Sequence, residues 1–248
     1  MKALITGGTS GIGKELGLKL SSLGYDLILV SRKENDLEEI RNEAKTEVTY
    51  FSYDLSKKEE CYKLLEEVKD IDIDIFINNA GFGDIGFFDK TSLEKEINMV
   101  ELNDIATLIL VKSFMIRFQN QNKGKILITA SSASFGVAGY MNVYYSSKAF
   151  VYSLAHGYYR ELKDRKSKVQ ISVLCPGPVK TNFESRGNMN FNFKAADPKK
   201  IADYTIKKFL KGRFEIVPTF KMKCAHLFSH FVPKKIISKV LNKQAEIK

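Results

Sequence analysis

Seven short apolar runs alternate with segments of helical length, and this alternation limits the fold more than any other feature of the chain. Most of the runs are apolar throughout rather than at every second position, which is typical of strands buried on both faces of a parallel sheet. Parallel strands joined through helices form right-handed crossovers. We therefore predict an α/β fold with a doubly wound parallel sheet of about seven strands. The predicted strands are residues 3–6, 27–30, 48–53, 73–77, 125–129, 169–174 and 214–217.

The length and composition fit one globular unit. The chain has 248 residues, of which 44% are hydrophobic and 27% charged. These values exclude a disordered, collagen-like or coiled-coil chain, and α/β units of about 200–250 residues are commonly single domains. We interpret residues 1–217 as one α/β domain and residues 218–248 as a basic, amphipathic C-terminal helical extension of that domain.

The net charge of +10 arises in the last part of the chain. Residues 1–193 carry 25 Lys and Arg against 25 Asp and Glu, whereas residues 194–248 carry 14 against 4. A nucleic-acid-binding domain would carry its basic stripe across the folded body, so the sequence predicts no nucleic-acid partner. The basic tail has three interpretations: a helix on an anionic membrane surface, a dock for an acidic acyl carrier, or a helix pair that caps the cleft or packs against another subunit.

The cysteines and the apolar runs suggest a compartment. Cys61, Cys175 and Cys224 are odd in number and far apart, so they predict neither a disulfide framework nor a zinc site. His226 and His230 lie one helical turn apart near Cys224, but no further ligand is evident, and we predict no metal. Without a signal peptide or a run of about 18 apolar residues, we expect a cytoplasmic protein.

A glycine-rich turn follows the first predicted strand. The sequence Thr6-Gly7-Gly8-Thr9-Ser10-Gly11-Ile12-Gly13 leads directly into a helical pattern over 14–23. Glycines let a pyrophosphate approach the backbone, and the first N–H groups of the helix hold its charge. The context predicts a dinucleotide site in a Rossmann-type sheet, although such turns also occur for structural reasons alone. Its candidate residues are Gly7, Thr9, Ser10, Gly11, Ile12 and Gly13.

The end of the second predicted strand indicates which dinucleotide is bound. An acidic residue here would bind the ribose 2′-hydroxyl of NAD. The chain has Ser31 and Arg32 instead, and a guanidinium with a neighbouring hydroxyl suits a 2′-phosphate. We predict NADP(H), with Arg32 as a solvated surface charge as the alternative.

Tyr144 and Lys148 are the candidate catalytic pair. They lie four residues apart in a helical stretch over 144–162, so their side chains share one face. A free tyrosine titrates near pH ~10, and a neighbouring ammonium lowers that pKa, which suits proton transfer at neutral pH. Ser131, just after the fifth predicted strand, offers a hydroxyl for the substrate oxygen.

Five separated signatures resemble the short-chain dehydrogenase/reductase family, in its branch of single-domain subunits. They are Thr6-Gly7-x-x-x-Gly11-x-Gly13, Asn78-Asn79-Ala80-Gly81, Ser131, Tyr144-x-x-x-Lys148 and Pro176-Gly177, in family order over residues 1–182. The resemblance implies that 1–217 is a dinucleotide-binding catalytic domain. It implies Tyr144 as the general acid/base, Lys148 as the residue that lowers its pKa and binds the nicotinamide ribose, and Ser131 as the group that orients the carbonyl. The family spacing favours Tyr144 over Tyr145, and Ser131 over Ser132 and Ser134.

The resemblance also implies further site residues. Asn103 fits the asparagine that bends a long helix and supports a proton-relay water, with an ordinary polar helix residue as the alternative. Thr181 fits the residue that binds the nicotinamide carboxamide, although a helix N-cap is an equal interpretation. The remaining cofactor candidates are Asp54, Leu55, Asn79, Ala80, Gly81, Pro176, Gly177 and Val179.

Large apolar residues mark the predicted substrate loops. They are Phe82, Ile85, Phe87, Phe88, Phe183, Met189, Phe191 and Phe193. We predict an apolar pocket for a hydrophobic ketone, such as a 3-oxoacyl or sterol-like compound, with packing under a lid as the alternative. Lys180 and Arg186 remain candidates to hold a carboxylate.

The sequence thus predicts an NADP(H)-dependent oxidoreductase that transfers hydride between nicotinamide and a carbonyl or secondary alcohol. We expect a homo-oligomer, a dimer or tetramer, because family members commonly associate through the helices around Asn103 and 144–162. The alternative is a non-catalytic NADP(H)-binding redox sensor that acts through its basic tail at a membrane or partner.

Overall fold

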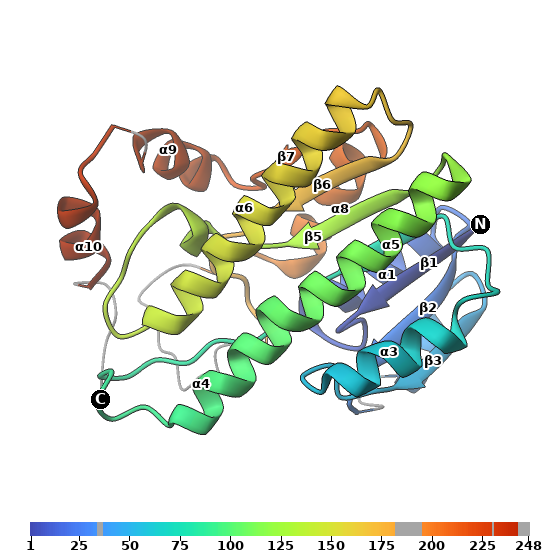
Figure 1. Ribbon diagram of the computed structural model, residues 1–248, viewed down its shortest axis with the longest axis horizontal. Helices are drawn as coiled ribbons and strands as arrows, with labels where there is room; N and C mark the ends of the chain where they lie inside the picture. Colours follow the sequence, from blue (N-terminus) through green and yellow to red (C-terminus); the bar gives the residue numbers. More distant parts are fainter. Residues whose placement is uncertain (34–36, 182–194, 230, 243–248) are drawn as a thin grey trace.

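The computed structural model of the chain describes residues 1–33, 37–181, 195–229 and 231–242. Its centre is a parallel sheet of seven strands in the order β3-β2-β1-β4-β5-β6-β7 (Figure 1). This confirms the predicted doubly wound α/β sheet. The strands are β1 (Lys2–Thr6), β2 (Asp26–Ser31), β3 (Val48–Ser52), β4 (Ile75–Asn78), β5 (Lys125–Thr129), β6 (Gln170–Leu174) and β7 (Glu215–Ile216).

Helices cover both faces of the sheet because successive strand residues point to opposite sides. Ala3 and Ile5 belong to the core under α1 and α8, whereas Leu4 and Phe76 belong to the core under α3, α5 and α6. Figure 1 shows α3, α5 and α6 crossing in front of the sheet. These helices are α1 (Gly11–Ser21), α3 (Lys58–Glu67), α5 (Thr107–Gln121), α6 (Asn142–Asp164) and α8 (Pro198–Leu210), with α2 (Leu37–Glu43) at the β2–β3 connection.

One long helix contains a wider turn. The segment α4 (Leu93–Val100) continues through the π-helical turn η1 (Glu101–Ala106) into α5. A π-turn inserts an extra residue into a helical turn and is frequent at functional sites. Here it contains the buried Asn103, at the place where the sequence predicted a bend.

The C-terminal segment leaves β7 and runs past the carboxyl ends of the strands. It forms α9 (Phe220–Ser229) and α10 (Lys234–Asn242), neither of which has a buried residue. In Figure 1, α9 and α10 extend away from the sheet, with α10 beside the connection between β5 and α6. Among the residues that the structure describes, no helix combines the length and apolar character needed to cross a bilayer.

Candidate active site

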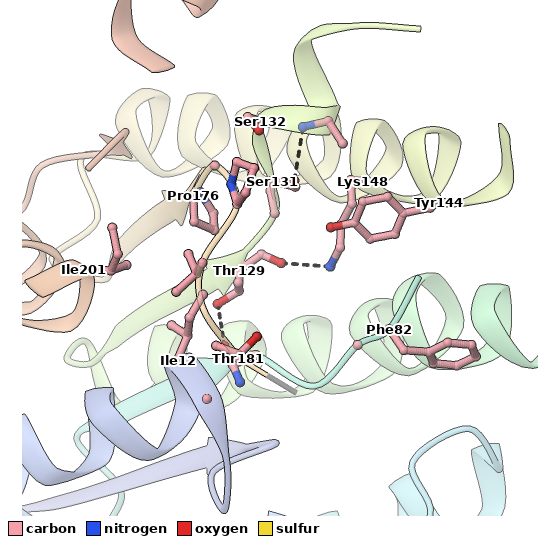
Figure 2. Close-up of a pocket in the computed structure, with 18 of the residues that line it drawn as sticks. Ile12, Phe82, Thr129, Ser131, Ser132, Tyr144, Lys148, Pro176, Thr181 and Ile201 are labelled. Carbon is pink, nitrogen blue, oxygen red and sulfur yellow. Dashed lines mark hydrogen bonds between the residues drawn. The ribbon is translucent and has the colours of Figure 1, made fainter. Parts of the chain in front are cut away.

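The loops at the carboxyl ends of the strands surround one cavity of about 1810 Å³. Its walls come from the turns after β1, β2, β3, β4, β5 and β6, and from the two tail helices. Ligands of doubly wound sheets bind at this end of the strands. Figure 2 shows part of the cavity, with Ile12 and Thr181 on one side and Tyr144 and Lys148 on the other.

The glycine turn brings backbone, not side chains, to the cavity wall. Gly7 has a φ of +63°, and a Cβ atom on Gly13 would lie 2.2 Å from the Gly7 carbonyl oxygen, so both positions require glycine. Ser10 precedes the first turn of α1 in an extended conformation, and its side chain does not cap the helix. The N-terminal N–H groups of α1 therefore suit the pyrophosphate of a dinucleotide.

Asn79 fastens this turn to the neighbouring strands. Its side-chain amide donates to the carbonyl oxygens of Thr6 and Gly7, each at 3.3 Å, and its Oδ1 accepts from Thr129 Oγ1 at 3.2 Å. The Thr6 hydroxyl accepts from the backbone N–H groups of Asn79 and Ala80 at 2.9 and 3.1 Å. These bonds explain why Asn79, Ala80 and the glycine turn act as one wall.

The predicted adenosine end of the site lies beyond β2 and β3. Thr9 Oγ1 donates to Ser31 Oγ at 2.9 Å, and Ser31 Oγ donates to the Lys33 carbonyl oxygen at 2.7 Å. Arg32 is exposed and lines the cavity, as does Lys33, which the sequence reasoning did not single out. Asp54 and the buried Leu55 also line this end. The position of the acidic residue of NAD sites is thus held by Ser31, next to two cations.

Ser131, Tyr144 and Lys148 come together in the middle of the cavity, and all three are buried. Tyr144 is hydrogen-bonded to the Ser131 side chain, and Ser131 Oγ accepts from the Ala133 N–H at 3.1 Å. Lys148 Nζ lies 6.0 Å from the centre of the Tyr144 ring and donates to the Thr129 carbonyl oxygen at 3.2 Å (Figure 2). One helix face and the end of β5 therefore place the three groups as their spacing predicted.

Burial controls the pKa of both titratable groups. It raises the pKa of Tyr144 to about 12, against the lowering effect of the Ser131 hydrogen bond. It lowers the pKa of Lys148 to about 8, against the raising effect of the Asp104 carboxylate. The sequence predicted that Lys148 would lower the pKa of Tyr144. In the structure the net shift of the Tyr144 pKa is upward, because burial removes hydration from the phenolate. The lowering effect of Lys148 itself stays a prediction.

Asn103 is held by three hydrogen bonds. Its amide nitrogen donates to the Phe82 carbonyl oxygen and to Ser147 Oγ, both at 3.0 Å, and its Oδ1 accepts from the Phe82 N–H at 3.1 Å. A Cβ atom on Gly81 would lie 2.8 Å from Asn103 Oδ1 and 3.3 Å from Lys148 Nζ. Asn103 thus connects the π-turn, the loop after β4 and α6 close to Lys148. The proton-relay water implied by the resemblance stays a prediction.

The segment after β6 passes the N-terminus of α1. A Cβ atom on Gly11 would lie 3.1 Å from Thr181 Cγ2, so Thr181 packs against the glycine turn. Pro176, Gly177 and Val179 also line the cavity, and Val179 forms a short parallel bridge with Ala196. These positions fit the predicted nicotinamide end of a dinucleotide site.

Only some of the apolar residues predicted to line the substrate pocket do line the cavity. Phe82 lines the cavity, whereas Ile85 packs into the core cluster around Met99 and Tyr144. Phe87 and Phe88 do not line the cavity; they are 51% and 65% exposed, and Phe87 packs edge-on against Tyr140. Expecting them in the pocket was wrong, because the chain turns outward after Gly86. Phe183, Arg186, Met189, Phe191 and Phe193 lie outside the described residues.

Other apolar residues line the cavity in place of Phe87 and Phe88. Met141, which the sequence reasoning did not single out, lines the cavity, and so does Tyr145, which it set aside in favour of Tyr144. The tail lines it with Met222, Ala225, Phe228, Ser229, Val232, Ile236, Ile237, Val240 and Leu241. The C-terminal helices therefore form a wall of the cleft, one of the interpretations that the sequence left open.

His226 attaches the tail to the body. Its Nδ1 lies 2.8 Å from Glu215 Oε1, and its ring stacks on Phe135 with centroids 3.9 Å apart. Glu215 also accepts from the Tyr152 hydroxyl at 2.9 Å. Among the described residues, no group of three or more metal-ligating side chains is found. His230 lies outside the described residues.

Comparison with known proteins identifies the family of the chain. The family described as short chain dehydrogenase matches residues 1–190. An uncharacterized oxidoreductase of Staphylococcus saprophyticus is 30% identical over 210 residues, which cover 82% of this chain and 88% of that protein. The very-long-chain 3-oxoacyl-CoA reductase of Neurospora crassa is 32% identical over 181 residues, which cover 69% of this chain but 54% of that protein.

A solved structure shows the same fold. The short-chain dehydrogenase from Sphingobium yanoikuyae in complex with NADPH has a TM-score of 0.83 at 24% identity, with 93% of each chain covered. Since the family match covers most of the residues, the chain belongs to the short-chain dehydrogenase/reductase family. It is therefore an oxidoreductase of alcohols or ketones that uses a nicotinamide cofactor.

Proposed function

We propose that the chain uses NADPH to reduce a hydrophobic ketone to a secondary alcohol. The single observation that carries this proposal is the position of Ser131, Tyr144 and Lys148. They are buried together where one cavity joins the glycine turn and Arg32 to an apolar wall. The cofactor and the substrate would therefore meet at a buried hydroxyl, phenol and amine.

The residues present fit a dinucleotide. Gly7 and Gly13 leave the backbone open where side chains would clash, and α1 directs its N-terminus toward the cavity. We assign the pyrophosphate to residues 7–13, the adenosine to Asp54 and Leu55, and the nicotinamide end to Asn79–Gly81 and to Pro176, Gly177, Val179 and Thr181. When bound, the reduced nicotinamide supplies the hydride that the carbonyl carbon accepts.

The preference for NADPH rests on the end of β2. Arg32 is exposed toward the cavity, and Ser31 stands where NAD sites carry a carboxylate. The guanidinium of Arg32 and the ammonium of Lys33 would both attract the dianionic 2′-phosphate.

The protein residues supply the proton and stabilise charge. Tyr144, with its pKa raised to about 12, is protonated at neutral pH and is ready to donate to the carbonyl oxygen. Ser131, already hydrogen-bonded to Tyr144, would donate to the same oxygen as negative charge develops, which is usually the largest catalytic contribution. Lys148 would stabilise the tyrosinate left after proton transfer. A tyrosine held in its acid form favours reduction over oxidation.

The substrate class follows from the far wall of the cavity. Phe82, Met141 and Met222 face it, together with the aliphatic residues of α10. The Neurospora relative is named as a reductase of very-long-chain 3-oxoacyl-CoA, which supports an acyl or similarly apolar ketone as substrate here.

The central test is NADPH oxidation with a panel of acyl, alicyclic, sugar and small polar ketones. We expect turnover of the apolar ketones, and a loss of about 10²–10⁴-fold in kcat for Tyr144→Phe, the usual contribution of a general acid. Tyr145→Phe is the matched control, since this neighbouring ring also lines the cavity. Binding of NADPH without turnover of any ketone would favour the redox sensor, and full activity of Tyr144→Phe would contradict the assigned acid.

Cofactor preference has its own test. Arg32→Asp should invert the ratio of kcat/KM for NADPH over NADH, because a carboxylate repels the 2′-phosphate and accepts from a free 2′-hydroxyl. Lys33→Gln should lower the ratio without inverting it. An unchanged ratio in Arg32→Asp would remove Arg32 from the cofactor site.

We also propose a cytoplasmic homo-oligomer. Supporting residues are the exposed apolar side chains Ile105, Leu108 and Ile116 along η1 and α5, and Phe150 on α6. Light scattering on the purified protein would test this, and a monomer at micromolar concentration would contradict it.

A further inference from the structure

We propose that α9 and α10 form a docking surface for an anionic lipid bilayer, and that the substrate cavity opens within this surface. The docking itself is independent of the proposed function. The second half, entry of an apolar ketone from the bilayer, rests on that function.

The apolar part of the surface lies on α9 and α10, which bury no residue of their own, and on Phe231 between them. Large apolar side chains that globular cores normally contain are instead exposed to solvent. They are Phe220 (79% exposed), Leu227 (62%), Phe228 (62%), Phe231 (78%), Ile236 (53%) and Val240 (52%). Short amphipathic helices of this kind bury their apolar face at the boundary between headgroups and acyl chains.

The charge of the same segment identifies the partner. Residues 216–242 contain five lysines and neither Asp nor Glu. These are Lys221, Lys234, Lys235 and Lys239, and Lys223, which donates to the Tyr204 hydroxyl at 3.0 Å. A second copy of this face would oppose lysines with lysines, whereas an anionic lipid surface complements them, at roughly 1 kcal/mol for each lysine near the membrane. Charge thus favours a bilayer over self-association.

The cavity mouth lies within this surface. Phe228, Ile236 and Val240 line the cavity, and each is more than half exposed. The cavity therefore opens to solvent beside these three side chains. Farther in, Leu241 and Ile237 approach Gly136, and Met222 approaches Gly177; a Cβ atom on these glycines would lie 2.7–2.9 Å from the nearest atom of Leu241 or Met222. Apolar side chains of the tail therefore line the cavity from the exposed face to the loops beside Ser131. A ketone dissolved in lipid would enter along these side chains toward Tyr144.

The contacts that attach α9 and α10 to the rest of the protein leave the apolar side chains of the docking surface pointing outward. His226, which points to Glu215 and Phe135, has a 17% exposed side chain, whereas its neighbour Leu227 is 62% exposed. At the end of α10, Asn242 Oδ1 accepts from the Gly139 N–H at 2.7 Å. Polar contacts thus hold the tail to the protein while large apolar side chains face away.

The test is flotation of the full chain with vesicles at physiological salt. Vesicles of phosphatidylcholine with about a third phosphatidylglycerol should carry the protein to the top of the gradient, and pure phosphatidylcholine should carry much less. The triple variant Lys234→Gln, Lys235→Gln, Lys239→Gln should bind about 100-fold more weakly, from the loss of three lysines at the surface. Leu227→Ser with Phe231→Ser should also release the protein, because these side chains insert but do not line the cavity.

The matched control removes the same charge elsewhere. Lys63→Gln, Lys112→Gln, Lys168→Gln changes exposed lysines outside the tail and should float like the unmodified chain. Equal flotation of the tail and control variants, or no flotation with anionic vesicles, would overturn the proposal. So would conversion of an oligomer to monomer by Leu227→Ser with Phe231→Ser, or binding of an acidic acyl carrier to these lysines without vesicle binding.

A second readout separates this proposal from the proposed function. With a water-soluble ketone and no vesicles, the triple tail variant should retain full NADPH-dependent activity, because its three lysines do not line the cavity. With a long-chain ketone supplied in anionic vesicles, its kcat/KM should fall in parallel with flotation. Inactivity of every variant with every ketone would contradict the reduction reaction and leave the flotation result to decide docking.

Discussion

The two walls of the cavity are built in opposite ways. The glycine turn with its partner loop after β4 is made of backbone, fixed by buried hydrogen bonds through Asn79 and Thr6. The tail wall is made of side chains on α9 and α10, which bury no residue and are attached through contacts such as His226 to Glu215. With the cofactor and substrate placed as we propose, the cofactor would rest on a hydrogen-bonded backbone frame and the substrate on helices held by few contacts. Mutations in the two walls should therefore have different kinetic signatures.

The largest effect should come from filling the rigid wall. Gly13→Ala adds a Cβ atom 2.2 Å from the Gly7 carbonyl oxygen and 2.6 Å from Asn79 Nδ2, so the turn must move. We expect NADPH affinity to fall by at least about 100-fold, since backbone must approach the pyrophosphate closely. Fluorescence titration of NADPH measures this directly.

Gly157→Ala is the control for this prediction. An added Cβ atom there meets nothing within 4 Å, and alanine should stabilise α6 by up to about 1 kcal/mol without changing NADPH affinity. Equal NADPH affinity in the two variants would contradict the rigid-wall interpretation.

An intermediate effect should appear in the pH dependence. Lys148 has a pKa of about 8, so its ammonium loses its proton as the pH rises through that value, while Tyr144 stays protonated. We expect kcat/KM for reduction to be flat near neutral pH and to fall by about tenfold per pH unit above about 8.

Asp104→Asn sharpens this prediction. Asp104 has its pKa raised to about 6 by burial, its carboxylate raises the pKa of Lys148, and its Oδ1 has no hydrogen-bond partner in the part of the chain that the structure describes. Removal of this negative charge lowers the pKa of Lys148, so the decline of kcat/KM at alkaline pH should begin at a lower pH. If the decline of kcat/KM at alkaline pH stays at the same pH in this variant, a group other than Lys148 controls that decline.

The smallest effect should come from loosening the tail wall. His226→Ala removes the contact with Glu215 and the stack on Phe135. We expect KM for an apolar ketone to rise several-fold while KM for NADPH and kcat stay the same, together with a loss of about 1 kcal/mol in stability, or roughly 2–4 °C in Tm. Steady-state kinetics and calorimetry measure the two effects.

Arg160→Ala breaks an exposed ion pair with Asp164 on the surface of α6 and serves as the comparison. Such pairs contribute little, so neither KM nor Tm should change appreciably. A change of KM for NADPH in His226→Ala would show that the two walls are coupled.

The same contrast explains how far the sequence alone could lead. The sheet, the glycine turn and the Tyr144–Lys148 pair follow from local periodicity and spacing, so they were predictable. Asn103 bonding to Ser147 and Asn242 bonding to Gly139 join residues 44 and 103 positions apart, which no local pattern encodes. The net upward shift of the Tyr144 pKa could not be predicted, because four-residue spacing reports a neighbour but not the depth of burial.

The substrate wall was the least predictable part. Phe87 and Phe88 follow the Asn-Asn-Ala-Gly motif closely, yet the chain turns them to the exterior, and residues more than 130 positions later line the cavity instead. Hydrophobic residues near a motif therefore indicate its neighbourhood without showing which of them face the ligand.

The position of Glu215, between the sheet and the tail, has a consequence for how such enzymes can change. This carboxylate, at the start of β7, contacts α6 through Tyr152 and α9 through His226. Because Ser131, Tyr144 and Lys148 all precede Val217, a different segment beyond Val217 would change the tail wall of the cavity and keep these three residues. Recombination at this junction would let a reductase acquire a new substrate wall and a new docking surface while its catalytic residues stay the same.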